Sequence, residues 1–312
     1  MHQDAAPRKG SSSKSVAAHP LAFAGLVVAN VALAFGPLFV RMADVGPVAV
    51  GFWRIALAAP VLVAMAAASG WRPRGTTPGL WAAVVIGGVC FAADLASWHI
   101  GILKTSLANA TFFGNSATLF FPIYGFVVAR AWPSRMQGFA LLLALVGAAL
   151  LMGRSLQIAP GHFGGDLLCL LAGVLYTFYF AAMAKARDTM APVPALAAST
   201  LASVLPLLLF ALFMREAIMP HDWTPLIAVA LASQVLGQGL MIFALGQLSP
   251  LIVGIGLLIQ PVVAAAIGWI GYGERLDAVD LAGAVLVAVA LVLVRRSRDE
   301  PAELAPEGVE EA

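Results

Sequence analysis

The sequence has little charge and almost no cysteine. Only 11% of its 312 residues are charged, whereas 61% are hydrophobic and the mean hydropathy is +0.92. Soluble domains carry about 25% charged residues, so this chain has too little polar surface to cover a water-facing globule. The net charge of +2 and the scattered Lys and Arg residues exclude a basic nucleic-acid-binding surface. The composition therefore predicts a membrane protein whose surroundings are the lipid bilayer.

Catalytic and cofactor motifs are missing as well. Cys90 and Cys169 each lie in an apolar stretch, with neither metal-site spacing nor a disulfide framework. The sequence contains no Walker motif, no Gly-x-Ser-x-Gly and no His-Glu-x-x-His, and its histidines are scattered. We therefore expect no enzyme activity, no cofactor, no metal and no direct use of ATP. An intramembrane enzyme or a structural membrane protein is the weaker alternative.

What the sequence does have is a series of long apolar segments. Each is close to the ~20 residues that span a bilayer as an α-helix. Turn-forming Gly, Pro and Trp residues separate them. The first run is too long for the apolar region of a signal peptide, so we expect it to be retained as a helix. The expected helices lie at residues 20–41, 47–69, 79–101, 107–129, 135–153, 164–185, 193–214, 224–246, 251–272 and 278–295.

The distribution of Lys and Arg predicts the orientation. If the N-terminus is cytoplasmic, twelve of these residues lie in cytoplasmic segments and five in outer ones. The positive-inside rule then places both termini in the cytoplasm. Residues 1–19 form a basic tail, and residues 297–312 form an acidic tail that we expect to be disordered.

Matching residues in the two halves predict an internal repeat. Three matches recur at offsets of 139–145: Arg41–Asp44 with Lys185–Asp188, Pro122 with Pro261, and Gly138 with Gly283. The repeats would be residues 20–153 and 164–296. Because each contains five helices, an odd number, the second must be inserted upside down. The predicted fold is an all-α membrane protein with ten transmembrane helices in two inverted five-helix repeats, an architecture typical of secondary transporters.

Several short motifs resemble one transporter family. Asp-Leu-Ala-Ser-Trp-His at 94–99, Thr-Ser-Leu-Ala-Asn-Ala-Thr at 105–111 and Pro122 are similar to the third and fourth helices of the drug/metabolite transporter superfamily. Leu-Ser-Pro at 248–250, Pro261 and Gly-Glu-Arg at 273–275 are similar to its EamA-type repeat. Within that superfamily the chain is most similar to the ten-helix, YddG-like aromatic amino-acid exporters.

The resemblance implies alternating access and efflux across a bacterial inner membrane. It covers about residues 20–296. One departure is in the first half, where Ala131-Trp132-Pro133 replaces the Gly-Glu-Arg that family members often carry after the fourth helix. Any role of that glutamate can therefore be carried only by Glu274.

Two ionisable residues lie well inside the predicted helices. Arg54 follows the outer start of the second helix and Asp94 precedes the outer end of the third, so both lie about 10 Å below the outer interface. Charges at this depth are costly and are usually functional. Two interpretations stay open: a structural ion pair, or a gating or proton-linked group.

Polar stripes suggest where a solute binds. Asp94, Ser97 and Trp98 share one helical face, and the repeat offset places them opposite Gln234 and Gln238 of the eighth helix. Hydrogen bonds between helices would explain either stripe alone. Two stripes at related positions in inverted halves favour opposite walls of one cavity.

Further candidates complete the predicted site. The substrate contacts we expect are Asp94, Trp98, His99, Asn115, Tyr176, Gln234, Gln238 and Gln260. Arg54, Pro122 and Pro261 are expected to act in gating or structure, the prolines through matching kinks. Amides, hydroxyls and aromatic rings suit neutral or zwitterionic solutes, so we predict export of amino acids, including aromatic ones, with other metabolites or drugs as the alternative.

Overall fold

The computed structural model of this protein describes residues 20–72, 77–105, 107–153, 160–272 and 278–296. Every regular element in these residues is helical. Nine helical segments are long and apolar enough to cross a membrane, and Arg135–Leu150 is a shorter apolar helix. The predicted all-α membrane fold is confirmed.

The first repeat contains five spans, two of which are broken. Its elements are α1 (Pro20–Ala34), α2 (Gly36–Met42), α3 (Pro47–Ala68), α4 (Pro78–Lys104), α5 (Leu107–Gly114), α6 (Ala117–Ala129) and α7 (Arg135–Gly153). The pairs α1–α2 and α5–α6 each form one span. Gly36 and Pro37 explain the first break. Pro37 has no N–H to donate to the carbonyl four residues earlier, so α1 cannot continue through it. A proline is instead favoured at the start of the next helix, where its N–H would have no partner in any case.

The second repeat also contains two interrupted spans. Its elements are η1 (Pro160–His162), α8 (Phe163–Arg187), α9 (Pro192–Phe213), α10 (Thr224–Val229), η2 (Ala230–Gln238), α11 (Gly239–Leu245), α12 (Pro250–Gly256), α13 (Ile259–Tyr272) and α14 (Ala278–Arg296). The η2 segment is π-helical and joins α10 and α11 into one span. The spans α5–α6 and α12–α13 are both broken near their middle.

The two prolines that we expected to kink their helices lie at different places relative to the helix breaks. Pro261 lies near the start of α13, just after the break, and has no N–H for the carbonyl of Leu257. That carbonyl instead accepts the N–H of Gln260 at 3.1 Å. Pro122 lies inside α6, several residues after the corresponding break. The two prolines therefore do not occupy equivalent places in the two broken spans, and their role in gating stays a prediction.

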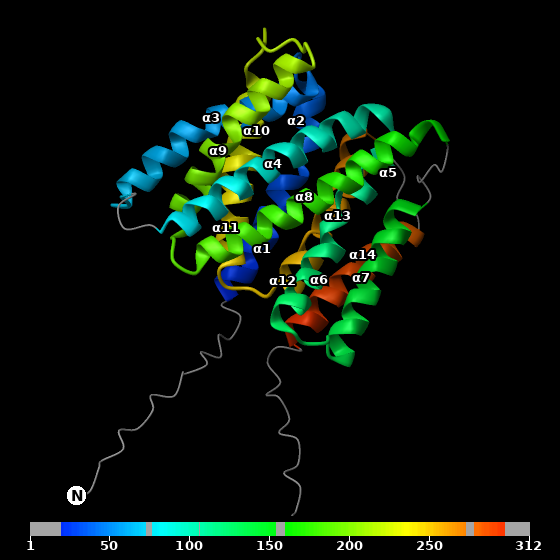
Figure 1. Ribbon diagram of the computed structural model, residues 1–312. Helices are drawn as coiled ribbons and strands as arrows, with labels where there is room; N and C mark the ends of the chain where they lie inside the picture. The colour runs from blue at the N-terminus through cyan, green and yellow to red at the C-terminus, as the bar shows by residue number, and fades with distance from the viewer. Residues whose placement is uncertain (1–19, 73–76, 106, 154–159, 273–277, 297–312) are drawn as a thin grey trace, which may run out of the picture.

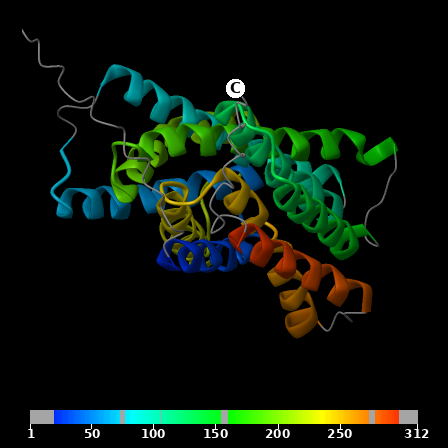
Figure 2. The same cartoon turned by 90° about the horizontal axis from the view of Figure 1, so that it is seen from below.

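Helix packing follows the inverted repeat. Helix α1 of the first repeat packs on η2 and α11 of the second repeat. Its counterpart α8, in the second repeat, packs on α4 of the first repeat. Equivalent helices pair as α3 with α9 and α7 with α14, and the two equivalent broken spans contact each other through α6 and α12. The last pair lies side by side in Figure 1, and a Cβ at Gly147 of α7 would lie 2.8 Å from the carbonyl oxygen of Gly283. Viewed from below (Figure 2), α13 and α14 lie at the opposite end of the molecule from the region where α3 ends and α4 begins.

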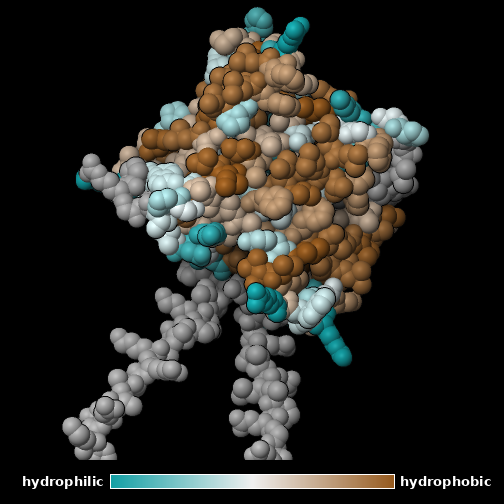
Figure 3. Space-filling model, viewed as in Figure 1, coloured by the Kyte–Doolittle hydropathy of each residue, from teal (hydrophilic) through white to brown (hydrophobic). Residues whose placement is uncertain are grey.

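The outer faces of the helices are apolar. Hydrophobic residues cover most of the face shown in Figure 3, and large exposed side chains include Val127 (69% exposed) and Phe213 (79% exposed). A soluble monomer rarely exposes such extensive apolar surface. The start of α1 and the end of α14 both lie toward the lower end of the molecule in Figure 1, as an even number of crossings requires. We call this the proximal side, and the side where α2 ends and α3 begins the distal side.

Candidate functional site

A cavity of ≈ 250 Å³ lies between the two repeats. Its residues come from α1–α4, the α5–α6 break, α8, α10, η2 and the α12–α13 break and α13. Val40, Val50 and His99 lie near the distal ends of their helices, whereas Tyr176 and Gln260 lie near mid-span. The cavity therefore runs from the middle of the molecule toward the distal side. It is smaller than the ~300–1,000 Å³ typical of drug-sized ligands, which favours a small solute.

Arg54 supplies the positive charge of the cavity. It lies on α3, is only 9% exposed and lines the cavity. Its Nε donates a hydrogen bond to Oε1 of Gln234 at 3.2 Å, and Gln234 Nε2 donates to Oγ1 of Thr200 at 3.1 Å. The guanidinium carbon lies 5.6 Å from the centroid of the Phe91 ring, within the range of a cation–π interaction. These contacts hold the guanidinium at the cavity wall.

Asp94 supplies the negative charge. It lies on α4, lines the same cavity and interacts electrostatically with Arg54. In the part of the chain that the structure describes, however, the hydrogen-bond partner of Arg54 is Gln234 and no bond to Asp94 is present. The two charges thus face one space without a direct bond. A solute with both a carboxylate and an ammonium group could interact with both.

The floor of the cavity is aromatic and amide-rich. The Tyr176 hydroxyl donates to Oε1 of Gln238 at 3.2 Å. Nε2 of Gln238 is buried and has no hydrogen-bond partner among the described residues. The Phe91 and Tyr176 rings stack with centroids 6.1 Å apart. A buried amide donor without a partner is costly, so a bound solute or water that accepts its hydrogen bond is favoured.

A second polar pair connects the two repeats near the middle of their spans. Gln260 of α13 donates from Nε2 to Oδ1 of Asn30 at 2.9 Å, and Asn30 Nδ2 donates to the carbonyl of Leu26 at 2.8 Å. Gln260 lines the cavity, whereas Asn30 is fully buried. Asn115 also lines the cavity, at the α5–α6 break. Both broken spans therefore place an amide side chain at the cavity wall.

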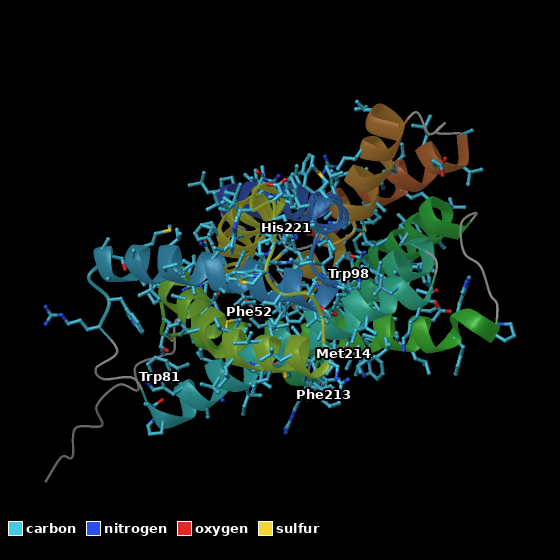
Figure 4. All side chains as sticks on the ribbon, turned by 90° about the horizontal axis from the view of Figure 1, so that it is seen from above. Phe52, Trp81, Trp98, Phe213, Met214 and His221 are labelled. Carbon is cyan, nitrogen blue, oxygen red and sulfur yellow. The ribbon has the colours of Figure 1, made fainter. Side chains whose placement is uncertain are left out.

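Trp98 and His99 lie together on the distal part of α4. Their ring centroids are 5.2 Å apart, and both residues line the cavity. His99 is only 1% exposed, and its Nδ1 has no hydrogen-bond partner in the described residues. Trp98 lies among the helices when the molecule is seen from above, whereas Phe213 lies at the periphery (Figure 4).

Most of the predicted site residues meet in this cavity. Seven of the eight predicted substrate contacts line it: Asp94, Trp98, His99, Asn115, Tyr176, Gln238 and Gln260. Gln234 differs, because it is fully buried behind Arg54. We expected Gln234 and Gln238 to share one face because they are four residues apart in a presumed α-helix. However, η2 is π-helical and its hydrogen bonds connect residues five apart, and of the two side chains Gln238 alone lines the cavity. Neither Pro122 nor Pro261 lines the cavity, although Pro261 directly follows Gln260, which does.

Sequence reasoning missed two participants. Phe91 stacks on Tyr176 and lines the cavity, and its spacing from Asp94 and Trp98 places all three on one helical face. That spacing could have identified Phe91. Thr200 supports Gln234 from α9, and nothing in the sequence around it indicates this contact. Glu274 lies outside the described residues. Among the described residues, no group of three or more His, Cys, Asp or Glu could hold a metal.

Known proteins resemble the chain in sequence and in fold. The sequence matches the EamA-like transporter family twice, over residues 20–153 and 163–296. No curated protein matches it significantly. A solved structure titled "Crystal structure of protein" is similar over 93% of this chain and 99% of its own, with a TM-score of 0.76 and 14% sequence identity. That likeness concerns the fold alone. The two family matches begin and end 143 residues apart, which defines equivalent positions in the repeats.

Proposed function

Because the chain belongs to the EamA-like transporter family, we propose that it exports small zwitterionic metabolites, amino acids including aromatic ones, by alternating access. The family supports a membrane transporter of small substrates. The class of solute is inferred from the chemistry of the cavity. No ATP-binding motif is present in the sequence, so the proposed transport is secondary.

The observation that carries this proposal is the pair of opposite charges in one cavity. Arg54 and Asp94 both line it, and Arg54 is held by Gln234 instead of by Asp94. A carboxylate solute would receive charge-assisted hydrogen bonds from the guanidinium, and its ammonium group would donate to the aspartate. An amino acid satisfies both charges at once. A solute with only one charge would leave the other side chain without a partner in a poorly hydrated site, which is costly.

Aromatic walls support a preference for aromatic side chains. Phe91, Trp98 and Tyr176 line the cavity beside the two charges. Aromatic rings bind other rings through offset or edge contacts worth about 0.5–1.5 kcal/mol beyond the area that they bury. We therefore infer that phenylalanine, tyrosine or tryptophan is bound more tightly than small amino acids.

The family resemblance implies efflux across a bacterial inner membrane, and the predicted orientation relates the cavity to the two sides of that membrane. With both termini in the cytoplasm of a bacterial cell, the distal side faces outward. A cavity that runs from mid-span toward the distal side, over a packed proximal half, corresponds to a state that releases solute outside. The proximal packing includes the Phe121 and Phe180 rings, whose centroids lie 5.3 Å apart.

The test is transport by the purified protein in liposomes. Labelled amino acids, a quaternary ammonium cation and a dicarboxylate are offered with and without a proton gradient. We expect uptake of amino acids, fastest for aromatic ones, and little uptake of the single-sign ions. If the cation or the dicarboxylate is taken up faster than the amino acids, the zwitterion proposal is overturned. A flux that requires the gradient would in addition identify protons as the coupling ion.

A further inference from the structure

Gly114 lies against the indole of Trp98. It is the last residue of α5, next to the break that precedes α6, and it lines the cavity together with Trp98. A Cβ built at Gly114 would lie 2.8 Å from both Cδ1 and Nε1 of Trp98. Real Cβ atoms essentially never approach another heavy atom within 3.0 Å, so any side chain here would force the indole to move.

The backbone does not require glycine at this position. Gly114 does not have a positive φ, unlike Gly70, whose φ is +76°. Its helical conformation is open to any residue, and alanine forms helices more readily than glycine. The equivalent residue of the second repeat is Leu257, which directly follows α12 as its C-cap residue and lines the same cavity. The repeat fold therefore accepts a large side chain here, and only the contact with Trp98 demands a glycine.

A displaced indole would enter the solute space. A methyl group at Gly114 would push Trp98 away from α5 by about half an ångström or more before ordinary contact is restored. Trp98 already lines the cavity, and His99 packs beside it with ring centroids 5.2 Å apart. Since protein interiors are close-packed, the open volume of ≈ 250 Å³ is where the ring can move.

We propose that Gly114 is a specificity-determining residue, which sets the position of Trp98 and so the largest side chain that the cavity accepts. This inference rests on the proposed transport of amino acids. The glycine keeps the indole withdrawn against α5, and the space that this leaves admits an aromatic solute. With a larger residue, the same cavity would select small amino acids such as alanine and serine.

The experiment compares transport of tryptophan and alanine by Gly114→Ala in liposomes. We expect the ratio of tryptophan to alanine transport to fall roughly tenfold, with alanine transport within about twofold of wild type. Gly138→Ala is the matched control, because a Cβ at that glycine of α7 meets nothing within 4 Å. It should leave the ratio unchanged. Adding Trp98→Phe to Gly114→Ala removes ring volume and should restore most of the ratio.

The outcomes separate this inference from the proposed function. Wild-type protein that transports no amino acid would refute the proposed function without reference to Gly114. Wild-type transport with an unaltered ratio in Gly114→Ala, or a lowered ratio that Trp98→Phe does not restore, would overturn the inference. If Gly114→Ala does not fold, as monitored by gel filtration and thermal unfolding, Trp98→Phe should restore folding to the double variant. Failure of that rescue also overturns the inference, because the clash would then involve some other group.

Discussion

The two repeats share a fold but differ in chemistry. Helices pack in equivalent pairs throughout, yet the charged residues of the cavity wall belong to the first repeat. At the 143-residue offset, Arg54 corresponds to Ala197 and Asp94 to Gly237. Both residues of the second repeat are small, and they permit close helix packing. The repeat thus fixes where helices lie, while single side chains decide the chemistry of the cavity wall.

One equivalent pair of contacts makes this difference concrete. Gly237 packs so closely on α1 that a Cβ there would lie 2.9 Å from Cγ of Leu33. The equivalent residues on the other side of the molecule are Asp94 and Tyr176, which both line the cavity. The same helix pairing is therefore a tight apolar contact in one place and a polar wall in the other. Symmetric packing does not require a symmetric site.

The strongest test of the comparison is topology. If the repeats are inverted, reporter fusions after Arg74, Arg135 and Arg298 should report cytoplasm, and fusions after Asp44 and Lys104 should report the outer side. The effect is all or none, because a fusion reporter is active on one side only. Alkaline phosphatase and green fluorescent protein fusions measure it. A reversed pair of neighbouring fusions would contradict the inverted repeat.

Removing the positive charge of Arg54 should produce the next largest effect, a loss of affinity for the solute. Arg54→Gln removes the guanidinium that we propose binds the solute carboxylate, and hydrogen bonds to charged groups contribute about 1.5–3 kcal/mol. Affinity for amino acids should fall by roughly 10- to 100-fold, as measured by isothermal titration in detergent. Arg54→Lys keeps the charge but loses the geometry that Gln234 stabilises, so its loss should be smaller.

Neutralising both charges distinguishes binding from structure. Either single variant leaves one charge without its opposite in the membrane, which lowers expression or thermal stability. Arg54→Gln with Asp94→Asn should recover folding but not solute affinity. If the double variant binds amino acids as wild type does, the two residues are a structural pair and the zwitterion site lies elsewhere.

A smaller effect should separate the two glutamines of η2. Gln238→Leu removes one direct solute hydrogen bond, worth ~1 kcal/mol or about fivefold in affinity. Gln234→Leu should act through Arg54, whose Nε loses its acceptor. In an Arg54→Gln background the Gln234 effect should therefore disappear while the Gln238 effect persists. If Gln234→Leu still lowers the affinity in the Arg54→Gln background as much as it does in wild type, Gln234 does not act by supporting Arg54.

The smallest expected effect concerns a contact between the repeats on the distal side. Asp44 accepts hydrogen bonds from the backbone N–H of His221 at 2.8 Å and of Asp222 at 3.3 Å. The bond from His221 is the main reason that the pKa of Asp44 lies below its usual 3.8. A lowered pKa in the folded state stabilises the protein above the unfolded pKa, and this contribution is lost as the pH falls through the folded value.

Thermal unfolding at several pH values tests this contact. Asp44→Asn should lower the melting temperature slightly near neutral pH, and the difference from wild type should vanish once the pH falls below the folded-state pKa of Asp44, which lies under 3.8. The effect is small because the carboxylate is exposed and screened by water. A difference that persists unchanged to low pH would show that the charge of Asp44 does not matter to the contact between the two loops.

Several features of the fold could be predicted from the sequence. The low charge and the ten apolar runs required helices in lipid, because only helices or closed barrels satisfy every backbone hydrogen bond there. The expected segment at 47–69 differs from α3 by one residue at its end. Breaks at Phe35 and near Asn115 were not predicted, since hydropathy records that a residue is apolar but not how its backbone turns.

The sequence by itself determined the class of protein, the inverted repeat and seven of the polar and aromatic side chains that line the cavity. Polar groups are expensive in lipid, so those that occur in apolar helices are few and stand out. The tertiary structure alone decided how they are used. It connected Arg54 to Gln234 and brought Gly114 against Trp98. Contacts between helices distant in the sequence depend on helix rotation and local winding, such as the π-helical turn of η2, and hydrophobic periodicity does not encode these.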